Sequence, residues 1–141
     1  MPVALQALGR AVKQAQYRHH RALETALAGV GSTLAQWDAL RAIDRAPGAS
    51  AHDLALATFQ TDQAFGKLAG RLEDRGLIER RSGHGRRIDH HLTPEGARVL
   101  AAGNTVADRI LAASFGALSE RERATLLRLL ERTGAPEAAD G

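Results

Sequence analysis

The residues with the clearest chemical potential are the basic side chains that cluster in the middle of the chain. From Lys67 to Arg87 there are seven Lys and Arg residues and three Asp and Glu residues, a surplus of four positive charges, whereas the whole chain carries a formal net charge of +3. The net charge therefore lies in this one segment, and the rest of the chain is close to neutral. Cationic side chains concentrated in this way suit a polyanion with grooves, and duplex DNA is the obvious candidate.

The first element that carries these charges is a predicted helix from Thr61 to Arg75. Thr61 is a good N-cap, and Asp62 in the first turn favours the helix dipole. Gly76 fits the left-handed position that commonly follows the last turn of a helix. The side of the helix predicted to be buried is apolar and consists of Phe65, Leu68, Ala69 and Leu72. The polar and basic residues therefore lie elsewhere on the cylinder.

The second charged element is a predicted β-hairpin. Residues 77–81 and 88–92 are typical of short strands, and the glycine-containing segment 82–85 is the predicted turn between them. The next segment, Thr93-Pro94-Glu95, supplies a capping hydroxyl, a proline at the first helical position and a carboxylate at the positive end of the dipole. A further helix is predicted from this point to about Ala113.

Three helices are predicted before the charged segment. Apolar residues three or four apart indicate a long amphipathic helix over residues 3–30. A second helix, capped by Ser32 or Thr33, ends at Pro47-Gly48, and Ser50 caps a short third helix. The order helix, helix, helix, strand, turn, strand predicts a mainly α fold with a small β-wing, which is a winged helix-turn-helix.

The end of the chain predicts an association surface. A capping box at Ser119-Glu120-Arg121-Glu122 opens a last helix. This helix carries more leucines than one narrow face can hold, namely Leu126, Leu127, Leu129 and Leu130. We therefore predict a homodimer in which residues 1–30 and 95–134 form a helical dimerisation region beside a DNA-binding lobe at residues 32–94. The tail, residues 135–141, is expected to be disordered.

Composition excludes several classes of function. The chain has no cysteine, which excludes disulfides, thiolate metal sites and thiol nucleophiles. There is no apolar run long enough to span a bilayer and no signal-peptide pattern, so we expect a soluble, cytoplasmic protein without a membrane partner. No phosphate-binding glycine loop, nucleophile elbow or acid–base carboxylate pair is present, so neither an enzyme nor a cofactor is predicted.

The candidate DNA contacts lie on the predicted helix from Thr61 and on the hairpin. A helix fits the major groove, residues near its N-terminus reach base edges, and basic groups hold phosphates. Thr61, Gln63 and Ala64 are at this reading end, and Gln63 suits adenine because its amide both donates and accepts hydrogen bonds. The remaining candidates are basic and comprise Lys67, Arg71, Arg80, Arg81, Arg86 and Arg87.

Each of these residues has a structural alternative. DNA contact is the favoured interpretation for the arginines of the hairpin; the structural alternative is a solvated turn for Arg86 and Arg87 and a charged strand edge for Arg80 and Arg81. Arg71 is placed where it could hold the wing through Glu73 or Glu79. Asp62 is the odd member, because a carboxylate at the reading end repels phosphate. We assign Asp62 to the start of the helix rather than to cytosine recognition.

The six histidines do not form a predicted metal site. His90 and His91 on a strand point to opposite faces, and His19 and His20 on a helix lie about 100° apart. No pair of histidines has the spacing of four residues that would bring both to one face of a helix. Hydrogen-bonded structural roles are therefore the favoured interpretation.

The sequence resembles the MarR (multiple antibiotic resistance regulator) family of bacterial transcription factors over nearly its whole length. The segments that carry the resemblance are Leu34–Leu40, Pro47-Gly48, Leu54-Ala55, Arg71–Arg80 and Leu92–Gly96. The last two of these, with their spacing and the two terminal helices, make a rather specific signature. Members of this family are similar in being winged-helix homodimers that bind pseudo-palindromic operators, and many release DNA when a small, often phenolic, ligand binds.

Three features depart from the family pattern. The family wing usually carries an Asp-x-Arg motif in which the Asp orients the Arg, whereas this chain has His84-Gly85-Arg86. Arg86 is then either looser or replaced in its contact by His84. The wing is also about two residues shorter than is common in the family, and Phe59-Gln60 stands where the turn commonly has Gly and an aliphatic residue.

The resemblance implies a ligand-responsive regulator, most simply a repressor, with duplex DNA and a second copy of itself as partners. It also locates a small aromatic effector near the first two helices, where a shared pocket would bring His19 and Trp37 together. A core role is the favoured alternative for Trp37. Asp62 and the short wing support a second interpretation, a winged-helix protein-interaction module, and a ligand sensor without operator reading is a third.

Overall fold

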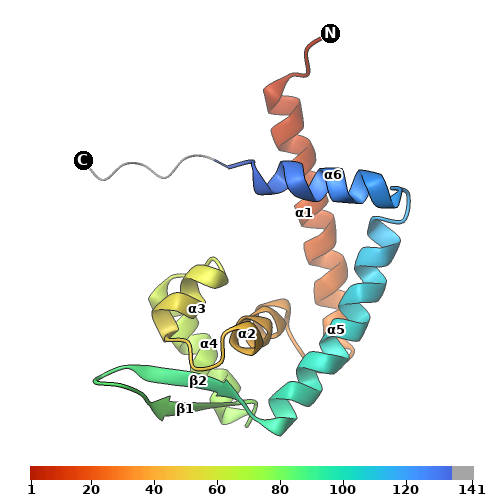
Figure 1. Cartoon of the computed structure of the whole chain (residues 1–141). Helices are drawn as coiled ribbons and strands as arrows, with labels where there is room; N and C mark the ends of the chain where they lie inside the picture. The colour runs from red at the N-terminus through yellow and green to blue at the C-terminus, as the bar shows by residue number, and fades with distance from the viewer. Residues whose placement is uncertain (135–141) are drawn as a thin grey trace, which may run out of the picture.

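The computed structural model describes residues 1–134, which form six helices and one two-stranded antiparallel sheet (Figure 1). In chain order the elements are α1 (Leu5–Ala28), α2 (Leu34–Arg45), α3 (Ala51–Ala57), α4 (Asp62–Asp74), β1 (Ile78–Ser82), β2 (Ile88–Leu92), α5 (Pro94–Ser114) and α6 (Glu120–Glu131). The predicted fold class, mainly α with a small β-wing, is confirmed. The prediction for residues 135–141 lies outside the described residues.

Local capping signals set most of the helix starts. The hydroxyl of Thr33, rather than that of Ser32, caps α2 and forms a capping box with Gln36. The predicted caps at the starts of the later helices are also present, namely Ser50, Thr61, Thr93 and Ser119, and Ser119 forms the predicted capping box with Glu122. Each cap satisfies a backbone N–H group that has no partner within its helix, so these boundaries are fixed by a few neighbouring residues.

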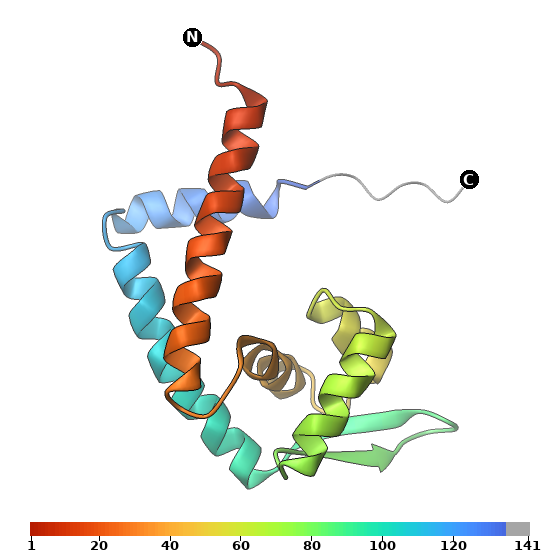
Figure 2. The same ribbon diagram turned by 180° about the vertical axis from the view of Figure 1, so that it is seen from behind.

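The core of the chain lies in the lobe, residues 32–94, and extends to the helices that flank it. Elements α2, α3 and α4 pack around one another and cover the base of the hairpin (Figures 1 and 2). The largest side chains that are completely buried come mostly from these elements and are Leu27, Leu40, Ile43, Leu54, Phe65, Leu72, Leu77, Ile78 and His90. The predicted apolar face of α4 is therefore the buried face, and its polar residues remain outside.

The hairpin is attached to the lobe along β2. Strands β1 and β2 pair antiparallel, with Ile78 opposite Leu92 and Ser82 opposite Ile88. The other edge of β2 pairs with the segment between α2 and α3, because Gly48 N–H donates to the carbonyl of His90 and His90 N–H donates to the carbonyl of Ala49. The base of the wing is therefore anchored on both sides, while its tip projects beyond the lobe (Figure 1).

A glycine at the start of α5 joins this helix to the lobe. A Cβ at Gly96 would lie 1.9 Å from the carbonyl oxygen of Leu77, so only glycine fits this position. Thr93 reinforces the junction, because its N–H donates to the same Leu77 carbonyl and its hydroxyl donates to the carbonyl of Gly76. The close approach lets α5 continue from the hairpin and then run beside α1 (Figure 2).

The terminal helices are far less buried than the lobe. The N-terminal half of α1 extends away from the lobe, and α6 crosses α1 (Figures 1 and 2). Helix α6 has no buried residue. Large apolar side chains on both helices are exposed, including Leu5, Leu8, Val12, Leu127, Leu129 and Leu130. Within residues 1–134, no helix is both long enough and apolar enough to cross a membrane.

Candidate nucleic-acid interface

The N-terminal half of α4 presents the predicted reading residues on its exposed side. Gln63, Ala64 and Lys67 are exposed, whereas Phe65 is completely buried. The Thr61 hydroxyl accepts a hydrogen bond from Ala64 N–H at 3.1 Å. Thr61 is therefore occupied in capping the helix, and its neighbours are free to face a groove.

A histidine that sequence reasoning missed lies beside Asp62. Nδ1 of His52, on α3, lies 3.0 Å from one carboxylate oxygen of Asp62 and 3.2 Å from the other. Both side chains are about two-thirds exposed. A ring N–H at Nδ1 would give the carboxylate of Asp62 a hydrogen-bond donor within the protein, which orients it against α3. The two residues are ten positions apart, and only the packing of α3 on α4 brings them together.

Two arginines of β1 form ion pairs. Arg80 donates through its backbone N–H and its guanidinium to the two carboxylate oxygens of Glu73, at 3.2 and 3.0 Å. These hydrogen bonds hold the pKa of Glu73 below its usual range. Arg81 pairs with Glu79 at 2.6 Å. The alternative in which Arg71 holds the wing through one of these glutamates is therefore wrong, because both are taken by the arginines of β1.

The wing has an Asp–Arg pair in an order that the family motif does not predict. Nε of Arg87 donates to Asp89 at 3.0 Å, and its NH2 group donates to the carbonyl of Gly48 at 2.9 Å. The Asp89 carboxylate also lies against the backbone of Gly83, where an added Cβ would be only 2.6 Å from it. The wing thus has an Asp–Arg pair, but it orients Arg87, and the motif arginine Arg86 has no carboxylate partner in the described part of the chain. The spacing of two residues between Arg87 and Asp89 is visible in the sequence.

Three of the predicted basic contacts have no intramolecular partner. Lys67, Arg71 and Arg86 are exposed, and within residues 1–134 no carboxylate or carbonyl lies within bonding distance of them. Arg75, at the end of α4, differs because it donates to the side chain of Gln36 and to the carbonyl of Gly31. These three predicted contacts without a partner lie on α4 and at the tip of the wing.

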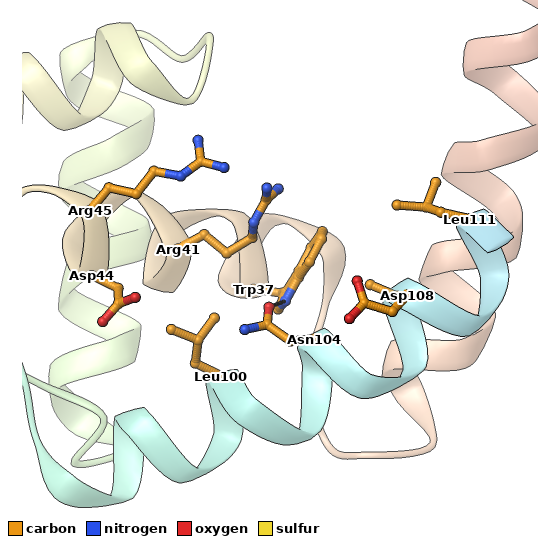
Figure 3. Close-up of a pocket in the computed structure, with 9 residues that line it drawn as sticks. Trp37, Arg41, Asp44, Arg45, Leu100, Asn104, Asp108 and Leu111 are labelled. Carbon is orange, nitrogen blue, oxygen red and sulfur yellow. Dashed lines mark hydrogen bonds between the residues drawn. The ribbon is translucent and has the colours of Figure 1, made fainter. Parts of the chain in front are cut away.

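Trp37 lines a cleft of about 340 Å³ between α2 and α5 (Figure 3). Its indole N–H donates to Asn104 at 2.9 Å, and the guanidinium of Arg41 lies 4.5 Å from the ring centre. Gly103 allows α5 to pass over the ring, since a Cβ there would lie 2.6 Å from the indole. Trp37 is buried, as its predicted core role requires, yet one side of it faces the cleft with Arg41 and Arg45.

His19 lies in a different cleft. Its ring packs edge-on against Phe115, with 5.0 Å between centroids, and its Nε2 contacts the hydroxyl of Ser114. This second cleft, of about 480 Å³, is lined by apolar residues of α1 and by Phe115, Leu126 and Leu130. In the single chain, His19 and Trp37 line separate clefts, because the His19 face of α1 is turned toward Phe115 and α6, and the first residue of α2, Leu34, completes that cleft.

His90 has a structural role in the wing. It is 1% exposed, its Nδ1 hydrogen-bonds the carbonyl of Ala49 at 3.0 Å, and its ring packs edge-on against Phe65. Burial lowers the pKa of His90 below its ordinary value, although the hydrogen bond to Ala49 opposes the shift. No three metal-ligating side chains gather anywhere in the described part of the chain.

Comparisons with known proteins agree on one family. The family model described as MarR family matches residues 30–88. Transcriptional regulator HosA of Escherichia coli O127:H6 is 31% identical over 102 residues, which cover 71% of this chain and 76% of HosA. The crystal structure of a probable transcriptional regulator from Pseudomonas aeruginosa is 31% identical, with a TM-score of 0.78 and coverage of 88% of this chain and 94% of that one.

A second set of solved structures comes from Mycobacterium tuberculosis. The MarR family protein Rv2887 in complex with p-aminosalicylic acid is 26% identical, with a TM-score of 0.74 and coverage of 91% of this chain and 98% of that one. Rv2887 in complex with DNA gives a TM-score of 0.76 at 25% identity, with the same coverage. The similarity extends over the lobe and the terminal helices alike.

Proposed function

This chain belongs to the MarR family of transcriptional regulators, and on that premise we propose that it binds a pseudo-palindromic operator as a homodimer and represses transcription until a small aromatic ligand releases it. It acts in the cytoplasm, as a regulator rather than an enzyme. The complex of the relative Rv2887 with DNA supports the choice of duplex DNA as the partner.

The observation that carries this proposal is the set of unpaired cations on α4 and the wing. Lys67, Arg71 and Arg86 are exposed and lack acidic partners in the described part of the chain, whereas Arg80, Arg81 and Arg87 hold the wing together through ion pairs. An exposed cation without a partner releases counterions when it meets a phosphate, which is the main source of affinity for DNA. Arg80 ties β1 to α4 and Arg87 ties the wing to Gly48, while the guanidinium N–H groups of these arginines that make no bond within the protein remain available to phosphates.

The homodimer is supported by the apolar surface of the terminal helices. The cleft of about 480 Å³ between α1 and α6 is lined mainly by aliphatic side chains, and α6 has no buried residue in the single chain. A second copy of the chain supplies the apolar surface that these leucines lack. Two-fold symmetry then presents two copies of α4 to half-sites about 34 Å apart, one turn of the double helix.

The cleft beside Trp37 suits an aromatic carboxylate as the effector. Arg41, which lies over the indole and 3.6 Å from Asp38, and Arg45 offer cationic partners for a carboxylate. Asp44 and Asp108 line the same cleft and offer acceptors for a hydroxyl or amino group on the aromatic ring. The complexes of Rv2887 with p-aminosalicylic acid and with salicylic acid support this ligand class. We assign the effector to this cleft rather than to His19, whose cleft a second copy fills.

The position of the Trp37 cleft suggests how a ligand alters DNA binding. The cleft is formed by α2 of the lobe and α5 of the dimerisation region (Figure 3). A ligand that fits one arrangement of these helices better than another shifts the separation of the two lobes, and with it the spacing of the two α4 helices.

The test begins with DNA fragments that the protein retains from its native genome. The most enriched fragment is used to compare Lys67→Ala with Lys13→Ala, since these are the only two lysines of the chain and Lys13 lies on α1. We expect Lys67→Ala and Arg86→Ala each to weaken binding about tenfold and Lys13→Ala to leave it unchanged. The logarithm of the wild-type binding constant should fall with that of the salt concentration with a slope of about −5 or steeper.

Other outcomes point to other functions. A flat salt dependence, or equal binding by Lys67→Ala and Lys13→Ala, would contradict the DNA proposal. If no fragment is enriched above random DNA, the winged-helix protein-interaction module becomes the better reading. The effector assignment fails separately if salicylate releases DNA from wild-type protein and from Arg41→Met at the same concentration.

A further inference from the structure

The turn between α3 and α4 contains a residue whose type the fold of this chain does not explain. Helix α3 ends with two hydrogen bonds, one from Gln60 N–H to the carbonyl of Ala55 and one from Phe59 N–H to the carbonyl of Leu56. This is the Schellman pattern of helix termination, in which the donor residue that comes first in the chain has a left-handed backbone conformation. Phe59 takes that place with φ of 58°.

Two other helices of the chain end with the same pattern but use glycine. After α1, Ser32 N–H donates to Leu27 and Gly31 N–H donates to Ala28, with φ of 76° at Gly31. After α4, the same pair of bonds runs from Leu77 to Leu72 and from Gly76 to Glu73, with φ of 72° at Gly76. Within residues 1–134, Phe59 is the one residue other than glycine with a positive φ. A Cβ makes this conformation unfavourable, so phenylalanine stands where the molecule elsewhere selects glycine.

Packing does not compensate for this strain. Phe59 is 94% exposed, and the neighbouring Leu56 is 63% exposed. The hydrogen bonds of the turn involve only the backbone of Phe59, so glycine would satisfy them equally well. An unfavourable conformation that presents an aromatic ring to solvent suggests a contact outside the chain.

Hydrogen bonds within the turn hold the backbone of Phe59 beside the recognition helix. The buried Thr58 hydroxyl donates to the carbonyl of Leu54 at 2.8 Å and accepts from the side chain of Gln60 at 3.1 Å. Two residues after Phe59, Thr61 caps α4. The backbone from which the ring projects therefore has a defined position relative to the helix that carries Gln63, Ala64 and Lys67.

We propose that Phe59 is a DNA-contact residue whose ring packs against the apolar parts of the duplex, a thymine methyl or a deoxyribose, where α4 enters the major groove. This inference rests on the proposed function. Because the ring lies next to the N-cap of α4, it is continuous with the proposed DNA surface, and an apolar contact of this kind is an ordinary way to recognise thymine. The contact compensates in the complex for the conformational strain of the free protein.

The test compares the full-length protein with Phe59→Gly, Phe59→Asn and Phe59→Leu on the enriched genomic fragment. Glycine and asparagine both tolerate the left-handed conformation, and asparagine keeps the backbone stiffer than glycine. We expect both variants to raise the Tm by a few degrees and to weaken DNA binding about tenfold, while Phe59→Leu keeps most of the affinity. A gain in stability combined with a loss of affinity is not expected from a merely structural residue.

The outcomes separate this inference from the proposed function. If Lys67→Ala and Arg86→Ala weaken binding but Phe59→Gly and Phe59→Asn bind as the wild type does, Phe59 has no DNA contact and only this inference fails. If Phe59→Gly changes the sedimentation of the free protein, its partner is a second copy of the chain and the inference is again wrong. If replacing thymine by uracil in the fragment abolishes the difference between wild type and Phe59→Gly, the ring contacts a thymine methyl; if the difference persists, it contacts deoxyribose.

Discussion

The lobe and the terminal helices of this protein are built by the same local rules but reach different states in a single chain. The lobe buries its apolar faces, including Phe65 and Leu72 completely, and its helices are closed by side-chain caps. Helix α6 has an equally good capping box yet buries none of its residues. Capping fixes where a helix begins, whereas burial decides whether it is stable. The lobe therefore holds itself together, whereas the exposed apolar surface of the terminal helices is what the proposed second copy would cover.

We expect the stability of the lobe to be independent of protein concentration, and the largest expected loss of stability is that of Gly96→Ala, at the junction between the lobe and α5. The new Cβ would lie 1.9 Å from the carbonyl oxygen of Leu77, so α5 must move away from the hairpin. We expect a loss of about 3 kcal/mol or more in the free energy of unfolding, measured by denaturant titration at two protein concentrations.

Gly70→Ala is the matched control for that experiment. A Cβ at Gly70, within α4, would meet no atom within 4 Å. We expect this variant to be stabilised by about 0.5–1 kcal/mol, because alanine favours a helix over glycine. A Gly96→Ala protein as stable as the wild type would show that the junction between lobe and α5 is less tight than the structure indicates.

A charge introduced on the apolar side of the terminal helices should disrupt the proposed dimer. Leu130→Glu places a carboxylate in the cleft between α1 and α6. We expect sedimentation to show monomers and operator affinity to fall about 100-fold, since each lobe then binds its half-site alone. Ala124→Glu adds the same charge to an exposed position of α6 that lines neither apolar cleft near this helix, and it should remain dimeric. A persisting Leu130→Glu dimer would refute the assigned interface.

What the sequence reveals also differs between local and long-range features. Helix starts and the hairpin were predictable because each depends on residues within a few positions, such as the Thr61 cap and the Gly76 stop. The fold class followed from the order of these elements. The Arg87–Asp89 pair has a spacing of two and is equally visible in the sequence, but the family motif predicts a carboxylate for Arg86, at position 84, and not one for Arg87 at position 89.

Contacts between elements were not predictable from pattern alone. His52 meets Asp62 because α3 packs on α4, and His19 is separated from Trp37 because α1 rotates its face toward α6. Helical periodicity gives the direction of a side chain relative to its own helix, and it does not give the neighbour that the helix will meet. The left-handed backbone of Phe59 was similarly hidden, because its residue type argues against it.

We expect the stability of the lobe to depend on pH because of the buried His90. Burial lowers the pKa of this histidine in the folded protein, so below its ordinary value of about 6.5 the unfolded chain takes up a proton that the folded chain does not. The free energy of unfolding is therefore expected to fall as the pH is lowered through and below 6.5. His90→Asn keeps a donor for the carbonyl of Ala49 but does not titrate. Denaturant titrations from pH 8 to pH 5 should show a flatter profile for this variant, and identical profiles would exclude His90 as the cause.

The smallest predicted effect lies at the point where the two regions meet. Arg75 at the end of α4 donates to the side chain of Gln36 at 2.8 Å and to the carbonyl of Gly31 at 2.9 Å, and so ties the lobe to the turn after α1. Arg75→Ala should lower the free energy of unfolding by about 1 kcal/mol, because two exposed hydrogen bonds of a charged donor are lost. Arg71→Ala, one turn earlier and without such bonds, should leave stability unchanged. Equal stability of the two variants would mean that water replaces the link at Arg75, and that the packing of α1 on α2 and α5 is sufficient to couple α1 to the lobe.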